Sequence, residues 1–246
     1  MRYITEEMLA FLAGIRANNT KEWFEPRKAA YLETVYEPLK ALGEALFAPY
    51  ADRPGMMHKA ARIYRDAQFP PYLHYRDTMW IYVRREAMYW SRTPSLFFEV
   101  SPEGARFGMR MSAPQPAFMA YLRDIWTEDA APFVEMVEAL EAQGLPLTGD
   151  EYKRPKPCPD EALLPYFKKK ALTVETTLPP GDVLFGDDLA AQVLTVFDAV
   201  LPLHDWLWQQ LDAFTAAQSA PPDAAPKGTP KDEPPLIQAP KDDFMW

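Results

Sequence analysis

The segment between residues 95 and 111 constrains the fold most strongly, because its pattern is typical of a β-hairpin. An apolar, aromatic run over 96–100 is followed by Ser-Pro-Glu-Gly at 101–104 and then by a second strand-like run over 105–111. Proline at the second turn position and glycine at the fourth suit a type I turn. The sequence therefore predicts two adjacent antiparallel strands here.

Side chains alternate in chemistry along the second of these strands. Phe107, Met109 and Met111 fall on one face, and Arg106 and Arg110 fall on the other. A strand with this alternation has one side in a core and one side open to polar surroundings. We therefore expect a sheet with an apolar face and a positively charged face.

Helical patterns surround this strand region. Thr5 is predicted to cap a first helix with a buried stripe, Asn19 to cap a short turn, and Pro38 to kink a longer helix that begins near Pro26. A further strand is expected at 80–83. Later in the chain we expect two helices between 115 and 144, strands near 151–154 and at 171–177, a short helix at 159–169, and a long helix from Asp187 that Pro202 interrupts.

This order of helices, strands, helices, strands and helix predicts an α+β fold, with a mostly antiparallel sheet packed with helices. We expect a single domain over residues 1–218. Residues 219–246 hold seven of the 26 prolines and few apolar residues, which predicts a disordered Pro-rich tail. Its tip, Asp-Asp-Phe-Met-Trp, is either an incidental end or a docking peptide for a protein partner.

Charge and motifs exclude several function classes. The net charge of −9 makes nucleic-acid binding unlikely, and no run of 18 apolar residues predicts a membrane span. The single cysteine, Cys158, and the absence of a signal peptide indicate a cytoplasmic protein. No nucleotide fingerprint, nucleophile elbow or HExxH motif occurs, so we predict no cofactor and no metal site.

Two stretches resemble a known family. The first is Asn-Asn-Thr-Lys-Glu-Trp-Phe at 18–24, followed by Arg27 and Tyr31, and the second is Arg-Ile-Tyr-Arg-Asp at 62–66. Together with the hairpin end and the Leu-Pro-Leu-His-Asp-Trp-Leu run at 201–207, they resemble the uncharacterised family called domain of unknown function 2461, over about residues 5–212. The resemblance implies a compact α+β domain of mostly bacterial proteins, with no reaction assigned.

The second stretch also supplies the candidate site residues. One interpretation is structural, in which Arg62 or Arg65 pairs with Asp66 or another carboxylate. The functional interpretation is a site for a small phosphate- or carboxylate-bearing ligand, because guanidinium groups bind such anions in a bidentate manner. The ligand-binding candidates are Arg62, Tyr64, Arg65, Tyr72 and Arg76.

Three functional hypotheses follow from these residues. The first is a domain that binds a small anion through the arginine and tyrosine surface. The second is an enzyme in which Asp66 acts as acid or base, while Arg62 and Arg65 hold an anionic substrate. Flanking arginines should lower the pKa of Asp66, which counts against this role. The third is an interaction protein that docks through residues 219–246.

Overall fold

The computed structural model describes residues 2–65, 68, 72–154 and 156–219, and these form one antiparallel six-stranded sheet packed with helices. The strand order is β1-β2-β3-β4-β6-β5. The predicted α+β class is confirmed. The strands are β1 (Met56–Ala60), β2 (Met79–Arg85), β3 (Ser95–Ser101), β4 (Gly104–Met111), β5 (Leu147–Thr148) and β6 (Leu172–Leu178). The predicted tail, residues 220–246, lies outside the described residues.

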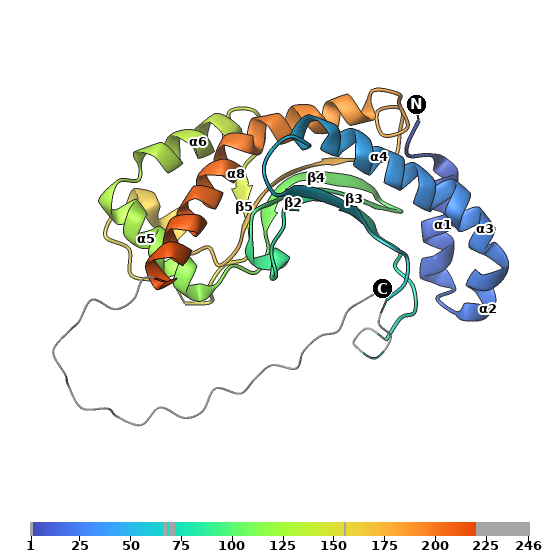
Figure 1. The fold of residues 1–246 in the computed structure, drawn as a ribbon, viewed down its shortest axis with the longest axis horizontal. Coiled ribbons are helices and arrows are strands. Elements are labelled where there is room, and N and C mark those ends of the chain that lie inside the picture. Colours follow the sequence, from blue (N-terminus) through green and yellow to red (C-terminus); the bar gives the residue numbers. More distant parts are fainter. Residues whose placement is uncertain (1, 66–67, 69–71, 155, 220–246) are drawn as a thin grey trace.

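The helices cover one face of this sheet and both of its ends. They are α1 (Glu6–Ala17), α2 (Lys21–Phe24), α3 (Lys28–Tyr31), α4 (Glu37–Phe47), α5 (Pro116–Glu128), α6 (Ala131–Glu141), α7 (Leu164–Phe167) and α8 (Leu189–Ser219). α4 packs on β1 and β2, and α8 packs on β3 and β4. Helices α1 to α3 lie at one end of the sheet, and α5 and α6 at the other (Figure 1).

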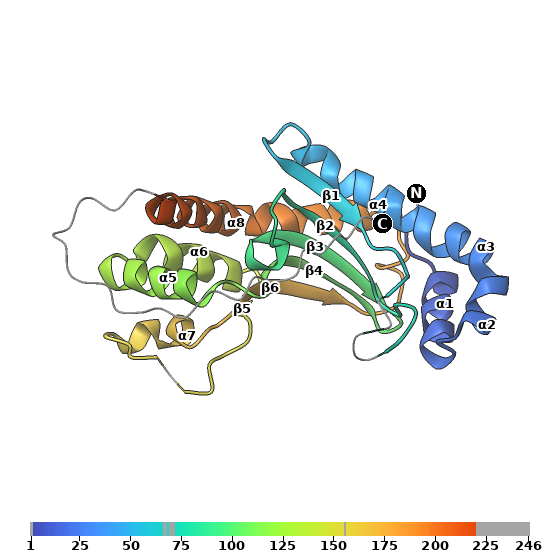
Figure 2. The same cartoon turned by 60° about the horizontal axis from the view of Figure 1, so that its bottom comes forward.

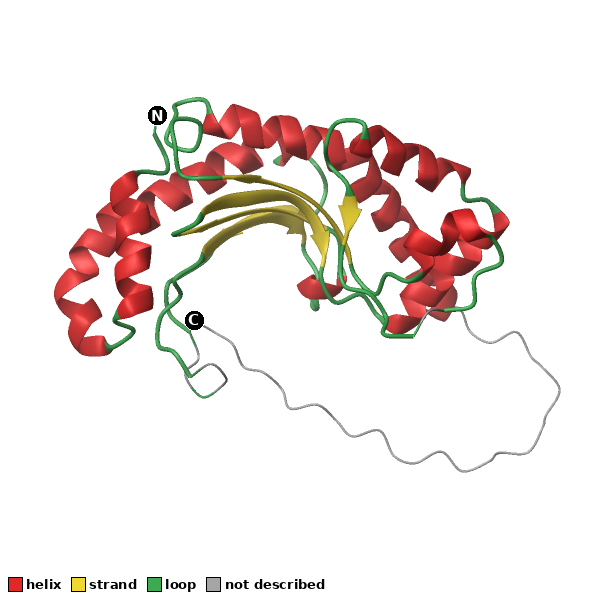
Figure 3. Ribbon diagram, turned by 180° about the vertical axis from the view of Figure 1, so that it is seen from behind, coloured by secondary structure: helices red, strands yellow, loops and turns green. Residues whose placement is uncertain are grey.

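The sheet curves, so its two faces differ. Its convex face is covered by α4 and α8, whereas no α-helix of the described chain lies over its concave face (Figures 1 and 3). Figure 2 shows that α4 and α8 run across the strands side by side. The concave face is therefore the side on which strand side chains meet polar surroundings.

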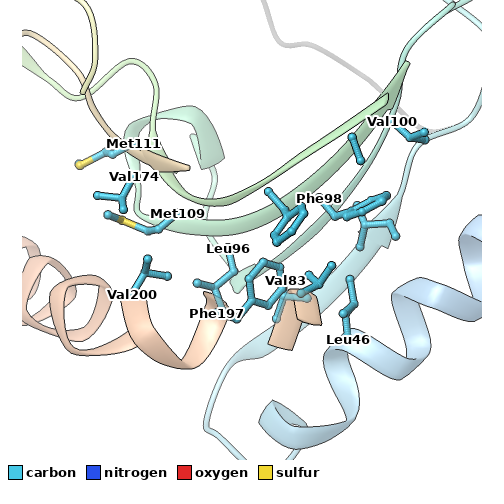
Figure 4. Close-up of a cluster of buried hydrophobic side chains, with 14 of the residues drawn as sticks. Leu46, Val83, Leu96, Phe98, Val100, Met109, Met111, Val174, Phe197 and Val200 are labelled. Atoms are coloured by element: carbon cyan, nitrogen blue, oxygen red, sulfur yellow. The ribbon is translucent and has the colours of Figure 1, made fainter. Parts of the chain in front are cut away.

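The core lies between the convex face and the two long helices. Leu96 and Phe98 of β3 lie on the side of the sheet that faces Leu46 of α4 and Phe197 of α8, and Val100 lies further along the same strand (Figure 4). All five side chains are fully buried. Burying one aliphatic or aromatic side chain of this size stabilises a fold by about 1.5–3 kcal/mol, so this cluster fixes how the helices sit on the sheet.

The predicted hairpin is confirmed. β3 and β4 pair so that Ser101 lies opposite Gly104, and Gly104 has φ +124°, a value that favours glycine. Phe107 and Met109 are buried in the core, whereas Arg106 lies on the opposite face, opposite Glu99 of β3. The alternation read from the sequence therefore describes the two faces of the sheet correctly.

Two prolines behave differently from each other. The helix that precedes Pro38 contains a π-helical turn over Leu32–Tyr36. The departure from regular α-helical geometry predicted at this proline occurs in that turn. The prediction that Pro202 interrupts the last helix is wrong, because α8 continues through it. Pro202 and Asp198 are exposed, so water can bond the Asp198 carbonyl that the proline leaves without a donor.

A strand predicted near 151–154 is also wrong. On the edge of β6 that faces away from β4, the pairing strand is β5, which ends at Thr148, and Glu151 makes only an isolated bridge with Lys169. Gly149 separates the two, with φ +127°. A positive φ takes the chain out of the extended conformation, and regular pairing stops there.

Candidate functional site

The candidate arginines lie where β1 and β2 extend beyond their regular pairing. Tyr64 and Tyr75 form an isolated antiparallel bridge. The backbone N–H of Arg65 donates to the His74 carbonyl at 2.9 Å, and that of Arg76 donates to the Ile63 carbonyl at 2.7 Å. We call residues 61–65 and 74–76 the hairpin extension. It brings Arg65 and Arg76 close together from two different strands.

The N-terminal helices hold this hairpin extension in place. The side-chain amide of Asn19 donates to the Tyr75 carbonyl at 2.9 Å, and its oxygen accepts from the Tyr75 N–H at 3.0 Å. Phe24 stacks on Tyr75 with ring centres 4.2 Å apart. The Tyr31 hydroxyl accepts a bond from the Ile63 N–H at 3.2 Å. The extension is therefore fixed by both hydrogen bonds and aromatic packing.

Asn19 thus has a role that the sequence did not reveal. The prediction that it caps the short turn carrying Trp23 is wrong, since this turn is the helix α2, whose N-cap is Thr20, and the Thr20 hydroxyl accepts from the Trp23 N–H. The available signal was the spacing of Asn19, Phe24 and Tyr31, which carried the family resemblance. Spacing alone could not show that all three contact the hairpin extension, which lies between 32 and 56 residues further along the chain.

Arg65 and Arg76 form a pair of like charges. Arg76 is half-buried, and its pKa is lowered first by burial and then by the nearby Arg65. Asp77, the carboxylate next to Arg76 in sequence, is paired instead with Arg16 at 2.5 Å. Within the described chain, no carboxylate forms an ion pair with Arg65 or Arg76. Their charges are therefore not neutralised by the residues described.

Arg62 lies apart from this pair. It is exposed, and its charge acts on Tyr31, whose pKa is raised to about 12 by burial despite the opposing effect of Arg62. Arg62 also has no ion pair to any residue that the structure describes. The geometry places it at the edge of the hairpin extension, on the side of α3.

The two remaining ligand-binding candidates, Tyr64 and Tyr72, are both exposed. Tyr64 is 47% exposed and Tyr72 is 66% exposed. Tyr72 has φ +59°, a left-handed conformation that is unusual for a bulky residue and costs about 1–3 kcal/mol. An exposed aromatic ring held at such a cost is unusual unless it has a role. The catalytic candidate Asp66 lies outside the described residues.

Comparison with protein families identifies the chain. The family model described as conserved hypothetical protein, DUF2461, matches residues 7–206. The chain belongs to this family. The match includes the hairpin extension and the helices that hold it, and it ends within α8. No curated protein matches the DUF2461 chain.

The concave face of the DUF2461 sheet carries a second group of arginines. Arg106 donates to Glu99 at 2.6 Å and lies 3.7 Å from Glu175. Arg110 pairs with Glu99 at 3.4 Å and also donates to the Tyr82 hydroxyl. The predicted positive charge of this face is therefore largely neutralised, because acidic residues of β3 and β6 lie opposite the arginines.

Arg110 is also enclosed by aromatic rings. Its guanidinium lies 4.2 Å from the ring centre of Phe97 and 4.9 Å from that of Tyr82. Its side chain is 16% exposed, and Phe97 beneath it is fully buried. Such cation–π contacts are stronger when they are removed from water. This group in the DUF2461 domain therefore has the character of a structural brace.

Neither a metal site nor a membrane span is found among the described residues of the DUF2461 chain. Across residues 2–65, 68, 72–154 and 156–219, no three histidine, cysteine or acidic side chains come together as a possible metal site. In the same residues, no helix combines the length and apolar character needed to cross a bilayer, the 31-residue α8 included.

Proposed function

We propose that this DUF2461 domain binds a small anionic ligand at the hairpin extension, through Arg65 and Arg76. One observation carries the proposal: two guanidinium groups lie close together, and neither is paired with a carboxylate of the described chain. Holding like charges together in a half-buried position is unfavourable. A bound anion offsets this repulsion and gains charge-assisted hydrogen bonds.

The surroundings favour a ligand with phosphate or carboxylate groups. Arginine presents a planar fork of donors that matches these groups. Arg62 adds positive charge at the edge, and Tyr64 and Tyr72 offer exposed rings on which a planar part of the ligand can stack. In a chain of net charge −9, such a local positive group attracts small anions specifically.

The two other hypotheses have less support. An enzyme that uses Asp66 as acid or base needs a carboxyl group of raised pKa, whereas neighbouring arginines lower it. The docking hypothesis for residues 219–246 concerns a segment that lies almost wholly outside the described residues. Binding at the hairpin extension is therefore the function that the geometry supports best.

A thermal-shift titration tests this proposal. Inorganic phosphate, pyrophosphate and citrate are added to the full chain, because a ligand that binds only the folded state raises the melting temperature. We expect a saturable rise with at least one of them, lost in Arg65→Ala and Arg76→Ala. Arg154→Ala is the matched control, since it removes an exposed arginine far from the hairpin extension in sequence.

The role of Arg62 is tested in the same titration. Because it lies at the edge of the hairpin extension, Arg62→Ala should weaken the response without abolishing it. A response that survives both Arg65→Ala and Arg76→Ala places the anion elsewhere and contradicts the proposal. The absence of any saturable response contradicts it as well.

A further inference from the structure

A second candidate site lies along α8, far in sequence from the hairpin extension. Two cavities of about 480 and 570 Å³ adjoin there and share Trp208 and Asp212 in their walls. Between them they follow α8 from His204 to Ser219, a helical length of about 22 Å at 1.5 Å per residue. We call this feature the α8 groove. Volumes of this size are ordinary for small-molecule sites.

One end of the α8 groove is polar. Arg53 donates to one oxygen of Asp205, and Nδ1 of His204 lies 2.9 Å from the other. Arg85 pairs with Asp212 at 2.9 Å, and its guanidinium lies 4.2 Å from the ring centre of Trp208. The walls of this end therefore combine charged groups with an aromatic surface.

This polar end contains two buried polar atoms without a partner in the described chain. They are Nη1 of Arg53 and Nε2 of His204, and the His204 side chain is 1% exposed. Burial lowers the pKa of His204, so the ring is neutral near pH 7 and donates from Nδ1 to Asp205. Buried polar groups nearly always have partners. Arg53 thus has an unused donor and His204 an unused acceptor, and both residues line the cavity at this end.

The other end of the α8 groove is apolar. Its walls include Phe118, Leu211 and Ala216. At its rim, Met88 is 87% exposed and Tyr89 is 55% exposed, which leaves large apolar side chains in water. Exposed apolar side chains gathered around a cavity are typical of a binding surface.

The charges of the α8 groove favour an anion. Arg53 is matched by Asp205 and Arg85 by Asp212, while Arg92 stacks on Tyr89 at 4.3 Å and has no ion pair within the described chain. With His204 neutral, the charges at the polar end are matched, and the excess of one positive charge in the groove comes from Arg92, in the wall of the apolar cavity. This excess occurs in a chain whose net charge is −9.

We propose that the α8 groove binds a small amphipathic anion, with an apolar or aromatic body along Phe118 and Leu211 and its acidic group near Arg53. The acidic oxygens accept from Nη1 of Arg53, and the body covers the apolar wall and the rim at Met88. This site is independent of the hairpin extension. The family match includes Arg53 and His204 of its polar end, but Asp212, Leu211 and Ala216 lie beyond it, so the wall formed by this part of α8 is expected to be specific to this chain.

The test uses 8-anilinonaphthalene-1-sulfonate, which has an aromatic body, a sulfonate and a fluorescence that rises in apolar sites. We expect saturable binding of one dye per full-length chain and displacement by dodecanoate. Ala216→Trp fills the apolar end and should weaken dye binding at least tenfold. Ala217→Trp is the matched control, because Ala217 is exposed and forms no part of either cavity wall.

The acidic group is tested separately. Arg53→Gln should weaken dodecanoate about tenfold, and dodecanol, which lacks the charge, should displace the dye at least tenfold less well than dodecanoate. Melting temperatures of all variants show whether each is folded. Arg65→Ala should leave dye binding unchanged, so this site and the hairpin extension can fail independently.

Three results would overturn the proposal. Dye binding that is unchanged in folded Ala216→Trp places the dye elsewhere. Equal displacement by dodecanol and dodecanoate removes the anionic requirement. A full-length chain that binds no dye also contradicts it. If a Phe244→Ala, Trp246→Ala double variant then does bind, the occupant of the groove is the chain's own C-terminal segment instead.

Discussion

Two pairs of arginines in this DUF2461 domain have opposite surroundings. Arg106 and Arg110, on the concave face of the sheet, share Glu99, and Arg110 is also enclosed by two aromatic rings. Arg65 and Arg76, in the hairpin extension, have no carboxylate partner in the described chain, and burial together with the charge of Arg65 lowers the pKa of Arg76. The first pair is bound within the fold, and the second is the pair that we propose binds an anion.

The comparison teaches that arginine content alone does not identify a site. The sequence made Arg106 and Arg110 look like a positive surface, yet β3 places Glu99 opposite Arg106. Arg76 has an acidic neighbour in sequence, Asp77, but that carboxylate is bound to Arg16. A structural arginine therefore differs from a candidate ligand-binding arginine in whether a carboxylate is paired with it. This pairing follows from strand register and tertiary contacts.

The largest expected effect comes from removing the shared carboxylate. Glu99→Ala leaves Arg110 without its ion-pair partner in a position only 16% exposed to water. We expect the free energy of unfolding to fall by about 3 kcal/mol, near the low end for a broken buried pair because some solvent reaches both groups. Urea denaturation measures this change.

Glu175→Ala is the matched control for this change. Its carboxylate lies 3.7 Å from Arg106, and its side chain is 26% exposed, so we expect a loss below about 1 kcal/mol. Equal losses of unfolding free energy in Glu99→Ala and Glu175→Ala would show that Glu99 stabilises the two arginines no more than Glu175 does.

The next effect concerns the contact that holds the hairpin extension. Asn19→Ala removes both hydrogen bonds to the Tyr75 backbone and should cost about 2 kcal/mol. The thermal response to phosphate should weaken too, because Arg76 follows Tyr75 directly. The exposed Asn18, whose amide bonds only Gly14, provides the control, and Asn18→Ala should cost less than 1 kcal/mol. If Asn19→Ala keeps the full thermal response to phosphate, the contact between Asn19 and Tyr75 is not needed for phosphate binding, and this part of the prediction is wrong.

A smaller effect is expected from the unpaired arginines. Arg65→Ala breaks no ion pair within the described chain and relieves repulsion on Arg76, so stability should change by less than about 0.5 kcal/mol. The same variant should lose the response to phosphate. A stability loss above 1 kcal/mol in urea denaturation would instead make Arg65 a brace like Arg110.

The smallest effect concerns a paired arginine at the surface. Arg16 donates to Glu103, which also accepts from Ser101, and these bonds lower the pKa of Glu103 to about 2 from its ordinary value of 4.5. The folded state therefore gains stability from this group above pH 4.5 and loses it as the pH falls toward 2. Glu103 is exposed, so the contribution is a few tenths of a kcal/mol.

This pH dependence can be measured directly. Glu103→Gln should flatten the slope of stability against pH between 4.5 and 2, while changing stability near pH 7 only slightly. Identical slopes in the two proteins would mean that the Arg16 contact contributes nothing in solution.

The sequence predicted those features that depend on neighbouring residues. The hairpin at 95–111 was predictable because side-chain alternation and the Pro-Glu turn are local. The path of α8 through Pro202 was not, since buried residues on both sides, such as Val200 and Leu203, keep the helix intact despite the proline.

The candidate site was predictable only in part. The sequence indicated the residues Arg65 and Arg76, but their proximity depends on the Tyr64–Tyr75 bridge. The contact of Asn19 with Tyr75 and the two arginine environments depend on the packing of segments far apart in the chain. These contacts cannot be predicted from residue patterns along the chain, because such patterns describe only neighbouring residues.

The amide of Asn19 has a further consequence. In the bridge with Tyr64, the N–H and carbonyl of Tyr75 point away from their partner strand, and both bond to this one side chain. A carboxamide carries the same donor and acceptor as a peptide unit, so Asn19 replaces the next strand with a single residue. It thereby closes a short stretch of strand edge that could otherwise pair with another molecule and lead to aggregation.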